Sequence, residues 1–246
     1  MQQALDEALR GLGDFGGLFP AGRTDRGVHA RMQVVGVRAP GELDPEALRL
    51  ALNARLPEGL GVAHAAAAPK GFHPQWGAVG KRYRYRLQLE GPPAPQWAGL
   101  CWSPAEHPRL SSARIDPARL ASLLRRCEGT RDFFAFHASS SVRKPRTVAR
   151  AELIACGGGR FEARFEGAGF ARYQVRILVG ACAAVAGGVL PEEQFAAALE
   201  SAAPLAGIRA PGEGLVLWEV LYPPTLDPFA PQRAAAGGVP ACPPFS

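Results

Sequence analysis

Lysine is nearly absent from this chain of 246 residues: the 28 basic residues comprise 25 arginines and only Lys70, Lys81 and Lys144. The formal net charge is +6, and such an excess favours polyanionic partners. Arginine suits phosphate and base recognition, because its guanidinium group bonds phosphate through two donors and stacks on flat rings. A GC-rich coding sequence would produce the same arginine, alanine, glycine and proline bias, so the ratio alone leaves the partner open.

Cysteine and long apolar runs are also scarce. The five cysteines are widely spaced without a Cys-x-x-Cys pair, and the five histidines are scattered, which argues against disulfide frameworks and metal clusters. The uncharged segment Ile177–Leu190 is short of the ~20 residues of a membrane span. The residues Met1–Glu7 lack the basic and apolar regions of a secretory signal, so we expect a cytoplasmic protein that does not bind membranes.

The composition is that of a globular protein with many loops. Apolar residues make up 47% and charged residues 20% of the chain, alongside 29 glycines and 23 prolines. A chain of this length can bury a sizeable core without cross-links. We expect three segments, namely an N-terminal half over 1–105, a C-terminal half over 106–225 and a flexible tail over 226–246.

Hydrophobic periodicity predicts an α+β fold. The two similar halves should form one extended, mostly antiparallel sheet with helices on one face. The predicted helices are Gln2–Leu12, Asp44–Asn53, Asp116–Arg126, Tyr173–Ala186 and Pro191–Ser201. The predicted strands are Met32–Arg38, Val62–Ala66, Lys81–Leu89, a hairpin of Thr147–Ala155 with Arg160–Glu166, and Leu215–Tyr222.

The strand Lys81–Leu89 has the clearest pattern. Tyr83 and Tyr85 alternate with Arg82 and Arg84, so the aromatic rings and the guanidinium groups should lie on opposite faces.

The segment Ala21–Ala30 concentrates charge in a glycine-containing loop, with Asp25 among Arg23, Arg26 and His29. Nearby cations favour the ionised carboxylate. Such a carboxylate is useful as a nucleophile or base toward an anionic substrate. A surface turn with a local ion pair would give the same pattern.

This segment resembles the GRTDxGVHA loop of the tRNA pseudouridine synthase A family, and further similar segments follow in the same order. They cover nearly the whole chain. The similar segments are Gln33, Leu52–Pro57, Phe72–His73, Lys81–Tyr85, Asp132–Phe136, Val175–Gly180, Ala210–Leu215 and Tyr222–Pro223.

The resemblance implies roles for four residues. Asp25 would be the catalytic aspartate, Tyr83 would lie against the target base, Arg176 would pair with Asp25, and Arg23 would help to hold the target nucleotide out of its helix. The apolar residues that surround Arg176 also indicate that its charge needs a partner.

The resemblance further implies that this enzyme isomerises uridine to pseudouridine in the anticodon arm of tRNA, at positions 38–40 in the family's usual pattern. It implies no cofactor, no metal and no DNA partner. A homodimer and a basic RNA-binding cleft on the face of the sheet opposite the helices are expected as well.

The chain departs from the family pattern in several places. It begins within the family's first helix, so the preceding strand is expected to be missing. We therefore expect Met32–Arg38 and Lys81–Leu89 to share a sheet, and a chain extended by about thirty residues to be more stable. Gln75 stands where the family has arginine, Arg26 follows the aspartate, and residues 170–174 replace a histidine-rich stretch.

Two other functions remain compatible with the sequence. One is an RNA-binding paralogue of the same fold with impaired catalysis. The other is a hydrolase that uses Asp25 on a small nucleotide or nucleoside.

Overall fold

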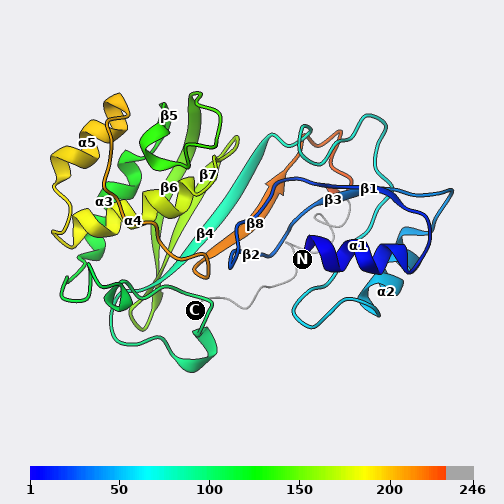
Figure 1. Ribbon diagram of the computed structural model, residues 1–246, viewed down its shortest axis with the longest axis horizontal. Helices are drawn as coiled ribbons and strands as arrows, with labels where there is room; N and C mark the ends of the chain where they lie inside the picture. Colours follow the sequence, from blue (N-terminus) through cyan, green and yellow to red (C-terminus); the bar gives the residue numbers. More distant parts are fainter. Residues whose placement is uncertain (231–246) are drawn as a thin grey trace. The chain divides into compact units, whose positions relative to one another are not determined.

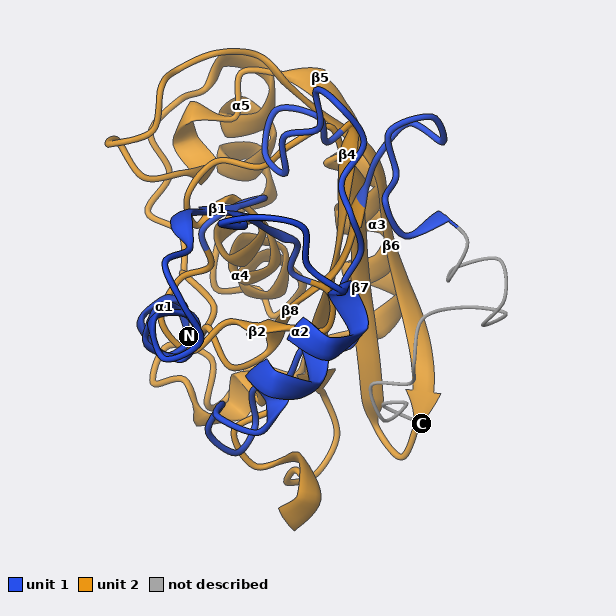
Figure 2. Ribbon diagram, turned by 90° about the vertical axis from the view of Figure 1, so that its right-hand side faces the viewer, with its two compact units in different colours: residues 1–23, 33–78, 221–242 blue, residues 24–32, 79–220, 243–246 orange. Residues whose placement is uncertain are grey.

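The computed structural model describes residues 1–230 (Figure 1). These residues form two compact units, and the chain enters each unit more than once (Figure 2). Unit 1 comprises residues 1–23, 33–78 and the chain from Leu221, while unit 2 comprises residues 24–32 and 79–220. These boundaries differ from the sequential halves expected from the sequence. Most of the expected tail, from residue 231 onward, lies outside the described residues.

Unit 1 contains helices α1 (Gln2–Arg10) and α2 (Pro45–Asn53) and strands β1 (Gly16–Pro20) and β3 (Val35–Arg38). The two strands pair in antiparallel fashion as a two-stranded sheet. Ala8 and Leu9 of α1 and Leu52 of α2 are buried together, which fixes the two helices on a small core.

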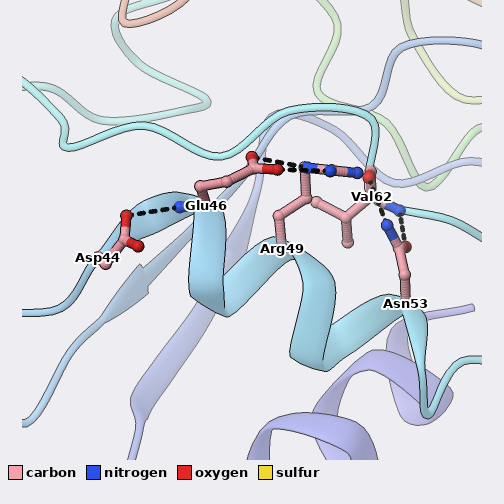
Figure 3. A network of polar contacts seen from close by, with 5 residues as sticks. All are labelled: Asp44, Glu46, Arg49, Asn53 and Val62. Carbon is pink, nitrogen blue, oxygen red and sulfur yellow. Dashed lines mark hydrogen bonds and ion pairs between the residues drawn. The ribbon is translucent and has the colours of Figure 1, made fainter.

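Side chains define both ends of α2 (Figure 3). Asp44 accepts a hydrogen bond from the Glu46 amide at 3.0 Å, as expected of an aspartate before a proline at a helix start. At the other end, the Asn53 amide accepts from the Val62 N–H at 2.7 Å and donates to the Val62 carbonyl at 2.9 Å. The predicted strand Val62–Ala66 is therefore wrong: this side chain satisfies the backbone groups of Val62, and the segment forms no ladder.

Unit 2 is built on a six-stranded sheet in the order β2-β8-β4-β7-β6-β5. Its strands are β2 (His29–Ala30), β4 (Gly80–Gln88), β5 (Gly129–Arg131), β6 (Arg146–Gly157), β7 (Arg160–Gly167) and β8 (Leu215–Leu221). The strands β4 to β7 pair in antiparallel fashion, whereas β2 runs parallel to β8. The mixed, mostly antiparallel fold and the predicted β6–β7 hairpin are confirmed.

Three helices accompany this sheet: α3 (Pro117–Arg126), α4 (Gln174–Ala186) and α5 (Glu192–Ser201). Short 3-10 turns occupy Pro95–Trp97, Pro104–Glu106 and Phe134–Phe136. Helix α3 contacts β6 and helix α4 contacts β4. Tyr85 and Leu87 of β4 are fully buried in the resulting core, as the alternation predicted.

The expectation of one extended sheet is wrong for the strands that the structure describes. Strand β3, within the predicted strand Met32–Arg38, pairs with β1, whereas β4 belongs to the six-stranded sheet. The sequence analysis did not predict β1, because its glycines indicate a loop. Strand β3 therefore finds its hydrogen-bond partners without joining β4.

None of the helices within residues 1–230 is long and apolar enough to cross a membrane.

Candidate active site

Asp25 lies in a loop that the six-stranded sheet holds in place. The Val28 amide donates to the Asp25 carbonyl at 3.1 Å, which closes a turn, and Val28 itself is buried. The following residues form β2 against β8. Gly27 within the turn has φ +81°, and an added Cβ would lie 2.8 Å from the Glu213 carboxylate, so only glycine fits there.

Two arginines contact the Asp25 carboxylate, Arg172 just before α4 and Arg176 in its first turn. Arg176 Nη1 lies 3.4 Å from Oδ2, and Arg172 Nε lies 3.7 Å from Oδ1. The exposed fractions of the side chains are 19% for Asp25, 10% for Arg176 and 57% for Arg172. The prediction that Arg176 lies close to Asp25, although 151 residues separate them, is confirmed.

A backbone carbonyl holds a second nitrogen of the Arg176 guanidinium group. Arg176 Nε donates to the Ala210 carbonyl at 2.8 Å, and the Ala210 amide donates to the Arg176 carbonyl at 3.1 Å. The segment around Ala210 approaches α4 closely because of Gly180, where an added Cβ would collide with the Ile208 carbonyl. The buried charge of Arg176 thus has two partners, which offsets its cost of desolvation.

Tyr83 of β4 forms an aromatic wall of this site. It is half-buried, and its ring meets Phe170 edge-on, with 5.4 Å between centroids and 88° between planes. Burial, with a smaller contribution from the negative charge of Asp25, raises the pKa of Tyr83 to about 12. The phenol is therefore neutral at physiological pH and can offer a flat, uncharged surface.

The sequence analysis missed a cationic cluster around Tyr173. The guanidinium carbons of Arg172, Arg176 and Arg209 lie 4.7, 5.3 and 4.5 Å from the centre of its ring. Tyr173 has φ 68°, a left-handed conformation that is unfavourable for an aromatic residue and often marks functional sites. The departure at residues 170–174 is the one sequence signal, and nothing in the sequence points to Arg209.

Arg23 is the fourth predicted site residue. It is exposed and belongs to unit 1, and it takes part in no ion pair within residues 1–230. Its predicted role rests on the sequence resemblance.

The opposite face of β4 carries a different set of charges. Arg82 bonds Glu166 at 2.8 Å and Glu219 at 2.9 Å. Arg84 and Arg164 both contact Glu162, at 3.2 and 3.1 Å, and Glu162 is only 3% exposed. Three guanidinium groups therefore meet three carboxylates on this face.

Metal ligands are not grouped within the described part of the chain, where no three His, Cys, Asp or Glu side chains come together in a suitable arrangement.

Comparisons with known proteins show which family this chain belongs to. A family model described as tRNA pseudouridine synthase matches residues 123–223. The tRNA pseudouridine synthase A of Syntrophotalea carbinolica is 34% identical over 228 residues, which cover 91% of this chain and 87% of the relative. The protein of the same name from Geobacillus kaustophilus is 36% identical over 205 residues, covering 82% of this chain and 76% of the relative.

A third relative, from Geobacter sp. strain M21, bears the same name and is 32% identical over 91% of this chain and 89% of its own. These matches place the chain among the pseudouridine synthases, a class of enzymes. Within that class it belongs to the tRNA pseudouridine synthase A family, as the sequence resemblance predicted.

Proposed function

We propose that this enzyme isomerises uridine to pseudouridine in tRNA, with Asp25 as its catalytic carboxylate. The observation that carries the proposal is the environment of Asp25: an ionisable group held by Arg172 and Arg176 and lying near the ring of Tyr83. This arrangement combines an anion, a cationic surround and a flat wall, which are the features needed to act on a nucleotide.

The reaction breaks the N1–C1′ bond of uridine, turns the base and joins C5 to C1′. The proton on C5 is lost and N1 ends protonated, so product and substrate are isomers and no oxidant or reductant is consumed. The proposal therefore needs no cofactor. Positive character develops at C1′, and a nearby carboxylate stabilises it. Asp25 would act on the ribose, either as a nucleophile at C1′ or as a base toward a ribose proton.

Arg176 and Tyr83 have separate roles in this proposal. Arg176 contacts Oδ2 of Asp25 while the Ala210 carbonyl holds Arg176, so the carboxylate is kept in one orientation. Tyr83 presents its neutral ring to the extruded base. A uridine in a stem must leave its stack to reach Asp25, and we assign to Arg23 the task of keeping that nucleotide out of the helix.

The substrate would be the anticodon arm, at uridines 38–40. A-form RNA is recognised mainly through phosphates and 2′-hydroxyl groups. We assign this contact to arginines that no carboxylate neutralises, which form the basic cleft of the proposal, with a homodimer as the active assembly. Arg209 is one candidate, since it contacts the Tyr173 ring and takes part in no ion pair within residues 1–230.

Mapping pseudouridine in bulk tRNA incubated with and without the full chain tests the proposal. The expected result is new pseudouridine in the anticodon arm only when the protein is present. Released uracil without pseudouridine, together with binding of free uridine monophosphate in preference to an anticodon stem-loop, would identify a hydrolase instead. Tight stem-loop binding without pseudouridine would identify the impaired paralogue.

A further inference from the structure

Trp76 in unit 1 is an exposed tryptophan on a rigid turn. Its exposed fraction is 81%, whereas Trp97 and Trp102 are buried. The remaining tryptophan, Trp218, is half-buried, with guanidinium groups 3.4 and 4.1 Å from its ring. Covering so large an apolar ring with a ligand would remove apolar surface from water, which is favourable.

One face of the Trp76 ring is already occupied. The His73 ring stacks on it, with 4.0 Å between centroids and 13° between planes. The two rings are therefore almost parallel. Because the indole is still 81% exposed, its surface remains open to a further flat ring.

Hydrogen bonds hold His73 and Trp76 in this arrangement. His73 Nδ1 accepts from the Gln75 amide at 3.1 Å and from the Trp76 amide at 3.2 Å, and the His73 carbonyl accepts from the Gly77 amide at 2.8 Å. An added Cβ at Gly77 would lie 2.9 Å from that carbonyl, so glycine permits the tight turn.

Contacts of Pro74 with other parts of unit 1 also hold the turn in place. Tyr222 Oη donates to the Pro74 carbonyl at 2.7 Å, and an added Cβ at Gly36 of β3 would lie 2.9 Å from Pro74 Cγ. Close packing against the Pro74 ring and a buried hydrogen bond to the Pro74 carbonyl fix the turn. Such a site loses little conformational entropy when a ligand binds.

The aromatic row continues beyond His73 and ends at a cation. Phe19 of β1 lies 6.0 Å from His73 between ring centroids, and the Arg38 guanidinium group lies 5.5 Å from the centre of the Phe19 ring. Arg38 is exposed and forms no ion pair within residues 1–230. Aromatic rings that stack bases, close to arginine that contacts phosphate, are characteristic of surfaces that bind unpaired nucleic acid.

We propose that Trp76, backed by His73, is a stacking platform for an unpaired base of the tRNA, distinct from the reacting uridine, with Arg38 directed at the backbone. The inference rests on the proposed function in one respect, namely that tRNA is the substrate. It adds a binding site in unit 1 that takes no part in the chemistry at Asp25. Base stacking tolerates every base, so the platform contributes affinity rather than sequence preference.

Equilibrium binding of unmodified tRNA to the full chain at fixed salt tests the platform. Trp76→Ala should weaken binding by about 5- to 150-fold, the range for loss of one stacked base. Trp76→Phe retains a stacking ring and should stay within about threefold of the unmodified chain. Leu50→Ala, which truncates another exposed apolar side chain of unit 1, is the matched control and should leave affinity unchanged.

Tryptophan fluorescence provides a second readout. Stacking of a base should quench the emission of Trp76, so Trp76→Phe should lose part of the tRNA-induced quenching while its affinity is kept. A Trp76→Ala affinity within twofold of the unmodified chain would overturn the platform and leave Trp76 to a protein partner.

Pseudouridine formation at saturating tRNA separates this inference from the proposed function. If the platform contributes only to binding, Trp76→Ala should form pseudouridine at the unmodified rate once the tRNA is saturating. Loss of affinity in Trp76→Ala with no pseudouridine from the unmodified chain would support the platform and refute the function. Normal pseudouridine formation by the unmodified chain, together with unchanged tRNA affinity in Trp76→Ala, would support the proposed function and refute the platform.

Discussion

The two faces of β4 use arginine in contrasting ways. On one face, Arg82, Arg84 and Arg164 each contact at least one glutamate. On the other face, where Tyr83 lies, Arg172 and Arg176 both contact Asp25. Arg209 joins these two arginines around the Tyr173 ring. The strand is the same and the amino acid is the same, but the first three arginines each contact a glutamate, whereas in the second set two arginines contact the same aspartate and Arg209 forms no ion pair within residues 1–230.

This difference separates a structural role from a functional one. Largely exposed ion pairs such as Arg82 with Glu166 contribute little stability, about 0–1 kcal/mol, and attract no further anion. Guanidinium groups that have no carboxylate of their own leave positive potential for the phosphates of a substrate. If the two faces differ in function as they differ in these contacts, substitutions on them should have unequal effects.

The largest contrast is expected between Arg176 and Arg82. Arg176→Ala should lower kcat by about 10²-fold, because Asp25 loses a fixed partner, as measured for single groups that orient charge in active sites. Arg176→Lys should recover part of the loss only, since one ammonium group cannot hold both Asp25 and the Ala210 carbonyl in the same geometry. Steady-state rates of pseudouridine formation would measure both.

Arg82→Ala is the matched control on the opposite face, where Arg82 contacts two glutamates, and should leave kcat close to that of the unmodified chain. Thermal melts would show that each variant is folded. Equal losses of kcat for Arg176→Ala and Arg82→Ala would remove the distinction between the two faces.

A smaller loss is expected at Tyr173. Tyr173→Gly removes the ring on which three guanidinium groups converge, and each ring–cation contact contributes about 0.5–1 kcal/mol. We expect kcat to fall by about tenfold, while glycine accepts the positive φ without strain. Tyr173→Phe keeps the ring and should keep the rate. A phenylalanine variant as slow as the glycine variant would assign the effect to the hydroxyl group instead.

The salt dependence of tRNA binding should change at Arg209. Affinity should fall steeply as salt rises, and Arg209→Ala should reduce the slope of log K against log salt by about 0.7–0.9, the value for one phosphate contact. Arg82→Ala should leave the slope unchanged, because its charge is already neutralised. Binding titrations from low to moderate salt would decide, and a flat response of the unmodified chain would count against RNA as the substrate.

The smallest effect concerns the pKa of Tyr83, which is raised from 10.0 to about 12. Between these values the unfolded chain loses the phenolic proton while the folded chain keeps it, so the free energy of unfolding falls as pH rises above 10. Tyr83→Phe removes this contribution and should lose less stability over the same range. Denaturant unfolding on both sides of pH 10 would measure the difference; identical alkaline declines would contradict the assignment.

Sequence patterns predicted what depends on local order. The alternation in Lys81–Leu89 gave the two faces of β4, and Asp44 and Asp116 marked the starts of α2 and α3. The apolar neighbours of Arg176 correctly indicated a buried cation that needs a partner, and the resemblance correctly identified that partner as Asp25.

Features that depend on distant segments were not predictable in this way. The glycines of β1 conceal a strand whose hydrogen bonds come from β3, and Asn53 satisfies Val62 through its side chain rather than through a strand. The contact between the Tyr173 ring and Arg209 joins the residue before α4 to the segment after α5, which lie 36 positions apart in the sequence. A contact between two such distant segments cannot be predicted from a local sequence pattern.

The most direct test of the central claim compares Asp25→Asn with Glu219→Gln in a single-turnover assay, with each protein saturated with tRNA. Both substitutions remove one carboxylate charge beside an arginine, one on each face of β4. The account predicts that Asp25→Asn binds tRNA but forms no detectable pseudouridine, whereas Glu219→Gln forms it at the unmodified rate. Pseudouridine formation by Asp25→Asn at close to the unmodified rate would contradict the account.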